Sequence, residues 1–538
     1  MRSFFNRLAK HGIRHVMRRG GTLSSETFCR YCEKHWKPLV NKKSEQTVLV
    51  GLFDWNPSIC AYLYTSHYLA ESHSARLAGY FFGDPARLQK ILPIYRSFGV
   101  NLEIDAASTS RVQKREAALL AREAFEKLDH AWDIFSISHD GVVLGDLIYD
   151  TFLRYHLEAT IDPRDPRLLP IVKDAIQISM SAAAFFSRNN VEAVVPYDPV
   201  YINSGIVHRH AILRGIPCYV VEYNPYRVYE YDSTFFGNDR SDYRNWPKKD
   251  PLKVYSKSVF SELSAEQQKE SRLIARVHLE SRLNGKVDPL LVFGRSAFSP
   301  ASKARVFCDD TVPRILVFLH DFCDAPNYMR WNLFPDFYHW LDFLLDQADR
   351  TPFQWYVKPH PNIHKDDGKG RANHSIVEHF RNKYPKVKFL DPSVSNRQII
   401  EEKVNALFTV RGTAGHEFAY CGIPVVNAGD NYHIEYNFNL NPRTITEFKE
   451  HILNADRLDP KIDKTEIESF YYLRYLHLNN CNSSEINLLP SEWLGDINLP
   501  KLEASSKIFE HFISNDTLQR REGIRIYLAN HVPTKFQK

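Results

Sequence analysis

The sequence predicts an α/β protein with two doubly wound domains that face each other across a cleft, together with extra helical segments. Two observations support this prediction. The chain has 538 residues, which is too long for one hydrophobic core, because domains usually have roughly 100 to 200 residues. Short apolar runs alternate with helical patterns in both halves of the chain, and this alternation is typical of parallel strands joined by crossover helices.

The first half opens with an apolar, β-branched run, TVLVGLF, which predicts a buried strand at residues 47–53 that ends at Asp54. A regular mixture of Ala, Leu and Phe with charged residues predicts a long helix at residues 111–128. The other expected elements are a helix at 58–71, a strand at 74–82, a strand at 191–196, a helix at 206–214 and a strand at 218–222. This order indicates the first Rossmann-like domain.

The pattern changes between residues 224 and 313, where polar and helical sequence such as SAEQQKESRLIARVHLESRL predicts a segment that bridges the two halves. Strand and helix patterns then resume and predict a second Rossmann-like domain. Its expected elements are strands at 314–319, 354–358, 387–390, 406–410 and 424–427, and a helix at 334–347. Beyond residue 456 the sequence is helical and irregular, and we expect it to pack back across the domains.

These patterns divide the chain into five parts. They are a basic N-terminal segment (1–45), an N-terminal Rossmann-like domain (46–235), a helical bridge (236–312), a C-terminal Rossmann-like domain (313–456) and a C-terminal helical extension (457–538).

Composition narrows the classes of partner. A net charge of +5 is small for this length, so the sequence does not predict a nucleic-acid-binding protein, which would neutralise many phosphates. The eight cysteines are scattered, and the close pair Cys29 and Cys32 lacks the second ligand pair of a zinc site. Together with the absence of a signal peptide, this usage predicts a reducing cytoplasm.

No apolar run approaches the roughly 20 residues of a transmembrane helix. The first 19 residues, MRSFFNRLAKHGIRHVMRR, mix apolar and basic side chains. This mixture predicts either an ordinary terminal helix or an amphipathic helix on an anionic membrane surface. The expected location is therefore the cytoplasm, with peripheral contact with the inner membrane as an open alternative.

Polar motifs follow the predicted strands of the second domain, at the sheet edge where open α/β sheets bind ligands. The first motif is Lys358-Pro359-His360-Pro361. Its prolines stiffen the loop, so the ammonium and imidazole groups can be directed at one phosphate. An ordinary structural turn would explain the motif equally well.

The second motif, Arg411-Gly412-Thr413-Ala414, joins the strand at 406–410 to a helix at 414–421. Small residues allow backbone amides to approach a ligand, and the start of a helix attracts anions. Thr413 can cap the helix or bind a phosphate oxygen. Glu417 returns to the same helix face four residues later, where it suits ribose hydroxyls or a base; the alternative is a solvated capping residue.

Two further motifs are expected at the same edge. The turn Gly422-Ile423-Pro424 closes the helix and leads to the polar loop at 428–432. His320 and Asp321 follow the strand at 314–319 and should face the cleft, where they could orient donor or acceptor. A capping or loop role would place them there as well.

KPHP, followed 53 positions later by Thr413 within VRGTAGHEFAYCGIPVV and then by GDNY, resembles the capsule polysaccharide biosynthesis family, which includes bacterial Kdo transferases. The resemblance implies a GT-B glycosyltransferase of surface-polysaccharide biosynthesis, in which His360 and Thr413 contact the donor phosphate and Glu417 contacts the nucleotide. It also implies a nucleotide-sugar donor on the second Rossmann-like domain (313–456) and a glycan or glycolipid acceptor on the first (46–235). The first-choice donor is a CMP-linked sugar acid such as Kdo or sialic acid, and the second choice is a nucleotide diphosphate sugar. The expected donor-binding residues are Lys358, His360, Pro361, Arg411, Gly412, Thr413, Ala414 and Glu417.

Direct sugar transfer requires a base in the first half that deprotonates the acceptor hydroxyl. The predicted candidates are Asp54, which ends the first strand, Asp198 in VVPYDPVY, and His210 in the following helix. His208 and Glu222 are rivals. The helix GDLIYDTFLRY carries a polar and aromatic face that predicts either acceptor contact or surface pairing; it consists of Asp146, Tyr149, Asp150 and Arg154.

No DxD-like pair lies near the expected phosphate site, so we predict an enzyme that uses neither a metal nor another cofactor. Two other functions fit the same motifs. One is a polyol-phosphate transferase that uses CDP-glycerol-like donors, and the other is a non-catalytic polysaccharide assembly protein.

Overall fold

The computed structural model describes residues 21–223, 226–230, 257–286, 297–300, 304–307, 311–329, 332–477, 488 and 501–532. The first 20 residues of the basic N-terminal segment lie outside this part of the chain, so their expected membrane contact stays a prediction.

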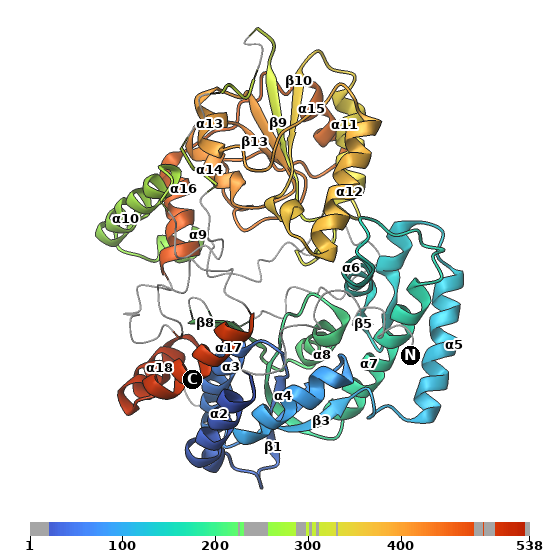
Figure 1. Cartoon of the computed structure of the whole chain (residues 1–538), viewed down its shortest axis with the longest axis vertical. Coiled ribbons are helices and arrows are strands. Elements are labelled where there is room, and N and C mark those ends of the chain that lie inside the picture. The colour runs from blue at the N-terminus through green and yellow to red at the C-terminus, as the bar shows by residue number, and fades with distance from the viewer. Residues whose placement is uncertain are drawn as a thin grey trace.

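The described residues form two lobes, each built on its own parallel sheet (Figure 1). The N-terminal sheet has the order β3-β2-β1-β6, with β1 Gln46–Gly51, β2 Arg76–Phe81, β3 Asn101–Asp105 and β6 Asn190–Val195. The C-terminal sheet has the order β11-β10-β9-β12-β13, with β9 Arg314–Phe318, β10 Gln354–Lys358, β11 Lys388–Phe389, β12 Ala406–Thr409 and β13 Val425–Asn427. The predicted α/β class with two doubly wound units is confirmed.

The strands are apolar because helices cover both faces of each sheet. In β1 every residue after the first is buried, which is typical of a central parallel strand. The N-terminal lobe contains α3 Asn56–Ser72, α4 Pro85–Ser97, α5 Arg111–Glu126, α6 Gly145–His156, α7 Leu168–Phe186 and α8 Ile202–Ile212, with the short elements η2 Ala131–Ser136, β4 Ser138–His139 and β5 Val142–Val143. The elements α4, β3 and α7 are additions to those expected from sequence.

The sequence predicts no apolar run of membrane-spanning length, but the helix α7 approaches this length. It has 19 residues and a mean hydropathy of 1.3, and by length and composition alone it could cross a membrane. However, 61% of this segment is buried inside the protein, where α7 packs against α5 and α8. Core helices of globular domains have the same apolar character.

The strand expected at 218–222 forms, but not as a full member of the central sheet. It is β7 Tyr219–Tyr223, which pairs antiparallel with β8 Tyr226–Glu230 in a separate hairpin. A single parallel bridge, Val194 to Cys218, links this hairpin to β6.

The C-terminal lobe contains α11 Phe337–Ala348, η6 Pro361–His364, α12 Gly368–Lys383, α13 Asn396–Glu401, α14 Ala414–Tyr420, α15 Ile445–Leu453 and α16 Lys464–Tyr471, which continues into a π-helix at Tyr472–Leu476. The described part of the expected bridge consists of α9 Lys257–Ser261 and α10 Ala265–Leu283. Both helices pack against α16, so this part of the bridge belongs to the C-terminal lobe.

The last two helices return to the N-terminal lobe, as expected from sequence. α17 Lys501–Asn515 and α18 Leu518–His531 pack against α3, and α17 also packs against α2 Gly21–His35, which leads to η1 Lys37–Leu39 (Figure 1). The buried carboxylate of Asp516 anchors them, since it accepts hydrogen bonds from Trp36 Nε1 at 2.8 Å and Tyr64 OH at 2.9 Å. Arg521 pairs with the same carboxylate and supplies the charge that a buried aspartate requires.

Candidate active site at the junction of the lobes

Three loops meet at the carboxyl edge of the C-terminal sheet because the strands that lead into them are neighbours. β9 lies between β10 and β12. The loop after β9 carries His320 and Asp321, the loop after β10 carries His360, and the loop after β12 carries the Arg411 to Thr413 motif. The carboxyl ends of neighbouring parallel strands are where open sheets bind ligands.

His320 occupies the centre of this edge and contacts the loop after β12. Its ring stacks on Phe337, with 4.5 Å between the ring centroids. The backbone N–H groups of Val410 and Arg411 donate to its Nε2 at 3.3 and 3.4 Å. Nε2 is therefore an acceptor, and a neutral ring must carry its proton on Nδ1. Desolvation, followed by the charge of Arg411, lowers the pKa of His320 well below its usual value.

His360 lies half-buried beside His320, within a mixed group of charges. Burial lowers its pKa; the carboxylate of Asp321 acts in the opposite direction, and Lys369 adds to the lowering. Lys369 also donates to the buried Asp321 at 2.8 Å. The lowered pKa favours the neutral form of the imidazole. Lys369 had no recognisable motif in the sequence, and only the fold brings it here.

Lys358 differs from the sequence expectation in where its ammonium group points. The side chain is buried, Nζ donates to Asn396 Oδ1, and the ammonium lies 5.2 Å from the centre of the Phe318 ring. Burial lowers its pKa to about 8, while Glu417 and Asp391 oppose this shift. The Lys358 ammonium group is therefore bound inside the protein, where it stabilises the start of the loop.

Arg411 is 6% exposed, and its guanidinium lies 4.9 Å from the centre of the Tyr328 ring. Its Nη2 donates to the Pro326 carbonyl at 2.5 Å and to Asn332 Oδ1 at 2.6 Å. Nε and Nη1 are buried and have no hydrogen-bond partner within the described part of the chain. A buried donor without an acceptor is costly, so these two nitrogens retain unused hydrogen-bonding capacity.

The residues after Arg411 have the backbone expected of a ligand-binding turn. Gly412 has a φ of +114°, which favours glycine, and open space surrounds the position where a side chain would begin. Thr413 is half-buried at the N-cap of α14 and makes no side-chain capping bond, so its hydroxyl is available. Ala414 is the first residue of α14, and Pro361 lies exposed at the start of η6. His320, on the loop after β9, lies between the loops that carry His360 and Thr413.

Glu417 is engaged elsewhere. Its side chain is almost completely buried and pairs with Arg282 of α10 at 2.6 Å between Oε1 and Nε. Arg282 itself is buried at 9% exposure and lies over the Phe298 ring. The structure therefore uses this carboxylate to bind α10 to the C-terminal lobe, and a nucleotide contact would require the pair to separate.

Asp198 is the N-terminal candidate that lies nearest the other lobe. It follows β6 and has a φ of +32°, a strained conformation that is concentrated at functional sites. Desolvation, followed by the carboxylate of Asp324, raises its pKa to about 6, whereas Arg154 opposes the shift.

The carboxyl ends of β6 and β9 meet directly at the junction of the lobes. Tyr201, three residues after Asp198, donates from its hydroxyl to Asp324 Oδ1 at 3.1 Å. Arg154 of α6 lies 3.9 Å from the same oxygen, and Lys369 lies 3.5 Å from it. These contacts place Asp198 and His360 on the two sides of one group of charges.

The remaining candidate bases have other environments. Asp54 is half-buried after β1 and pairs with Lys90 at 3.3 Å. His210 is completely buried, its Nε2 lies 2.8 Å from Ser179 Oγ, and burial lowers its pKa to about 3. His208 is also buried with a pKa lowered to about 3. These two histidines lie in the core of the N-terminal lobe, which corrects the expectation that His210 reaches the acceptor.

Glu222, the last rival, lies in the β7–β8 hairpin, where it pairs with Arg227 at 3.8 Å and accepts from the Tyr229 hydroxyl. Its carboxylate is therefore engaged within the hairpin. Among the described residues, no group of three or more His, Cys, Asp or Glu side chains is arranged to hold a metal ion.

Several solved structures resemble parts of this fold at low similarity. KpsC from Thermosulfurimonas dismutans, a beta Kdo 2,4 transferase, matches 53% of this chain and 79% of its own, with 11% identity and a TM-score of 0.30. UDP-GlcNAc 2-epimerase from Neisseria meningitidis, bound to UDP-GlcNAc, matches 80% of this chain and 98% of its own, with 9% identity and a TM-score of 0.22. HepE from Anabaena in complex with UDP-glucose matches 84% of this chain and 100% of its own, with 11% identity and a TM-score of 0.22. No protein-family model matches the chain, and no curated protein sequence matches it.

Proposed function

We propose that this protein is a GT-B glycosyltransferase that transfers a sugar from a nucleotide-activated donor on the C-terminal sheet to an acceptor on the N-terminal sheet. One observation carries the proposal. The carboxyl edges of the two parallel sheets meet through the contact of Tyr201 with Asp324, with His360 on one side and Asp198 on the other. A fold alone does not define a function, so the argument rests on the chemistry of this junction.

The donor side offers hydrogen-bond donors and positive charge for a leaving phosphate. The unpartnered nitrogens of Arg411 are the strongest of these, and the His360 imidazole and the Thr413 hydroxyl lie on the flanking loops. Fixed donors of this kind stabilise the charge that develops on the leaving group. The helix α14 has only seven residues, so we assign this role to side chains and to the open backbone at Gly412.

The acceptor side supplies the base. The Asp198 carboxylate takes the proton of the acceptor hydroxyl, and the acceptor oxygen forms a bond to the anomeric carbon of the sugar. The bond between that carbon and the donor phosphate oxygen breaks, and the nucleotide leaves with the electron pair. A carboxylate whose pKa is raised toward the working pH suits this proton transfer better than an ordinary aspartate does.

For the donor we propose a CMP-linked sugar acid of the Kdo or sialic acid type, and for the acceptor a glycan or glycolipid of a bacterial surface polysaccharide. We further propose that the enzyme acts in the cytoplasm without a metal ion. The KPHP and Thr413 motifs that resemble the capsule polysaccharide biosynthesis family support this choice. A polyol-phosphate transferase would bind the same nucleotide but would transfer the phosphate with the polyol, so analysis of the product distinguishes the two.

A thermal-shift panel of CMP, CDP, UDP and GDP tests the donor site. At 100 times its dissociation constant, a ligand that binds only the folded protein adds about 2.7 kcal/mol of stability. We expect one nucleotide to stabilise the wild-type protein by this amount and to lose most of the effect in His360→Ala, because the imidazole faces the phosphate.

His364→Ala is the matched control, since His364 lies in the same loop with an exposed side chain. This variant should keep the full shift. Equal stabilisation of the His360→Ala protein, or no response of the wild type to any of the four nucleotides, contradicts the proposed donor site.

A further inference from the structure

The polar face of α6 joins the two lobes. Figure 1 shows α6 at their junction. Tyr149 donates from its hydroxyl to Asp336 Oδ2 at 2.6 Å, and Asp150 accepts hydrogen bonds from Asn327 of the C-terminal lobe. By contrast, Asp146, on the same face, pairs with Arg209 inside its own lobe. The helix face that the sequence left open between acceptor contact and surface pairing is therefore an interface between lobes.

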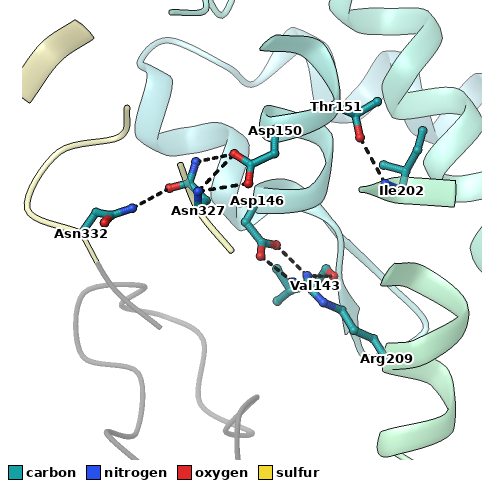
Figure 2. A network of polar contacts seen from close by, with 8 residues as sticks. All are labelled: Val143, Asp146, Asp150, Thr151, Ile202, Arg209, Asn327 and Asn332. Carbon is teal, nitrogen blue, oxygen red and sulfur yellow. Dashed lines mark hydrogen bonds and ion pairs between the residues drawn. The ribbon is translucent and has the colours of Figure 1, made fainter. Parts of the chain in front are cut away.

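A continuous chain of buried side chains leads from α6 to Arg411, and Figure 2 shows its first part, from Asp150 through Asn327 to Asn332. Asn327 donates to Asp150 from its backbone nitrogen at 3.0 Å and from Nδ2 at 2.8 Å. Asn332 Nδ2 donates to Asn327 Oδ1 at 3.3 Å, and Asn332 Oδ1 accepts from Arg411 Nη2 at 2.6 Å. All four side chains are at most 6% exposed. We call this chain, from Asp150 through Asn327 and Asn332 to Arg411, the interlobe relay.

The relay fixes the direction of the Arg411 guanidinium. Both hydrogen bonds of Nη2 go to the loop that Asn327 anchors, one to the Pro326 carbonyl and one to Asn332. Asn332 lies so close to Gly429 that a side chain there would come within 2.4 Å of its Oδ1. With Nη2 held, the unpartnered Nε and Nη1 keep one orientation in the described part of the protein.

Within the relay, Asp150 and Asn327 form the link that crosses from one lobe to the other, and water would replace this link if the lobes separated. A hydrogen bond that folding exchanges for one with water contributes little net stability, so a buried polar link can break and re-form. When it is formed, it favours one orientation because its groups would be unsatisfied in any other buried arrangement. Relative movement of domains is the usual expectation for an interface of this polar kind.

We propose that Asp150 and Asn327 are positioning residues of the donor site: docking of the loop around Asn327 on α6 orients Arg411 for an anionic group of the nucleotide-linked donor. This inference rests on the proposed function for the identity of the ligand. The relay itself is a property of the unliganded protein. Coupling of this kind makes donor binding depend on the arrangement of the lobes.

Three variants test the relay by donor binding, measured calorimetrically with the nucleotide selected in the thermal-shift panel. Asp150→Ala should weaken binding about tenfold or more, as loss of a hydrogen-bonded arrangement around a charged group predicts. Asp150→Asn keeps an acceptor for Asn327 and should restore most of the affinity. Thr151→Val removes the bond from Ile202 N to Thr151 Oγ1, which lies within the N-terminal lobe on the same helix, and should leave the affinity unchanged.

A double-mutant cycle separates the relay from general damage to the fold. If Asp150 acts through Arg411, Asp150→Ala should cause no further loss of affinity in an Arg411→Ala background. In the steady state, the relay predicts a higher KM for the donor and an unchanged KM for the acceptor. Additive losses, or equal losses in Thr151→Val, overturn the proposal.

Hydrogen exchange of the free protein keeps this test independent of the proposed function. Asp150→Ala should accelerate exchange of amides at 327–329, 332–334 and 409–413, whereas Thr151→Val should not. If this pattern appears but no nucleotide binds the wild type, the relay stands and the assigned ligand fails. If the 409–413 amides stay protected, the relay fails whatever the ligand is.

Discussion

Replacing Asp198 with asparagine is expected to lower the kcat of sugar transfer by roughly 100- to 10,000-fold, the usual contribution of a general base. Asparagine tolerates the positive φ of this position and has nearly the same shape, so the fold should be preserved. The amide cannot accept the proton of the acceptor hydroxyl. The measurement is the initial rate with donor and acceptor at saturating concentrations.

The pH dependence of the same reaction is a second test of Asp198 as the general base. The Asp198 pKa is raised to about 6, and only the carboxylate form is a base. The kcat/KM of the wild type should therefore rise with pH and level off above about 6, and this limb should disappear in the Asp198→Asn variant. Asp54→Asn is the matched control, because Asp54 also follows a strand of the same sheet but pairs with Lys90. A greater loss of activity in Asp54→Asn than in Asp198→Asn would show that Asp54 is the base.

The sequence was informative wherever a local pattern determines local structure. The apolar runs predicted most central strands of both sheets to within a few residues, because strands buried on both faces contain almost only apolar residues. The sequence was less informative where tertiary packing decides which elements pair. The run at 218–222 has the composition of a central strand, yet β7 pairs with β8 in a hairpin. The composition of a strand does not determine which other strand it pairs with.

For the candidate site, too, the sequence predicted local features but not long-range contacts. The sequence identified the loops that carry His320, His360 and Thr413, because polar residues directly after apolar strands are a local signal. It could not show that Glu417 faces Arg282, 135 residues earlier in the chain, or that Lys369 reaches Asp321 from α12. These are long-range pairings, and Arg282 and Lys369 lie in no recognisable motif.

The buried pair of Glu417 with Arg282 leads to the second large effect. Replacing Glu417 with alanine is expected to lower the free energy of unfolding by about 3 to 5 kcal/mol, because Arg282 would retain a buried charge without its partner. Denaturation in urea measures this loss. If Glu417 instead served mainly to hold a nucleotide, the variant would keep its stability and lose affinity.

Glu468→Ala is the matched control for this prediction. Glu468 is equally buried and also pairs with a residue of α10, but the side chain of that partner, Arg276, is 49% exposed and water can solvate it when the pair is removed. Its loss of stability should therefore be smaller than that of Glu417→Ala. The double variant Glu417→Leu with Arg282→Met should recover most of the stability, since a buried ion pair replaced by apolar residues of similar volume is often neutral. Recovery of stability together with unchanged nucleotide affinity would establish that this carboxylate holds α10 in place and takes no part in donor binding.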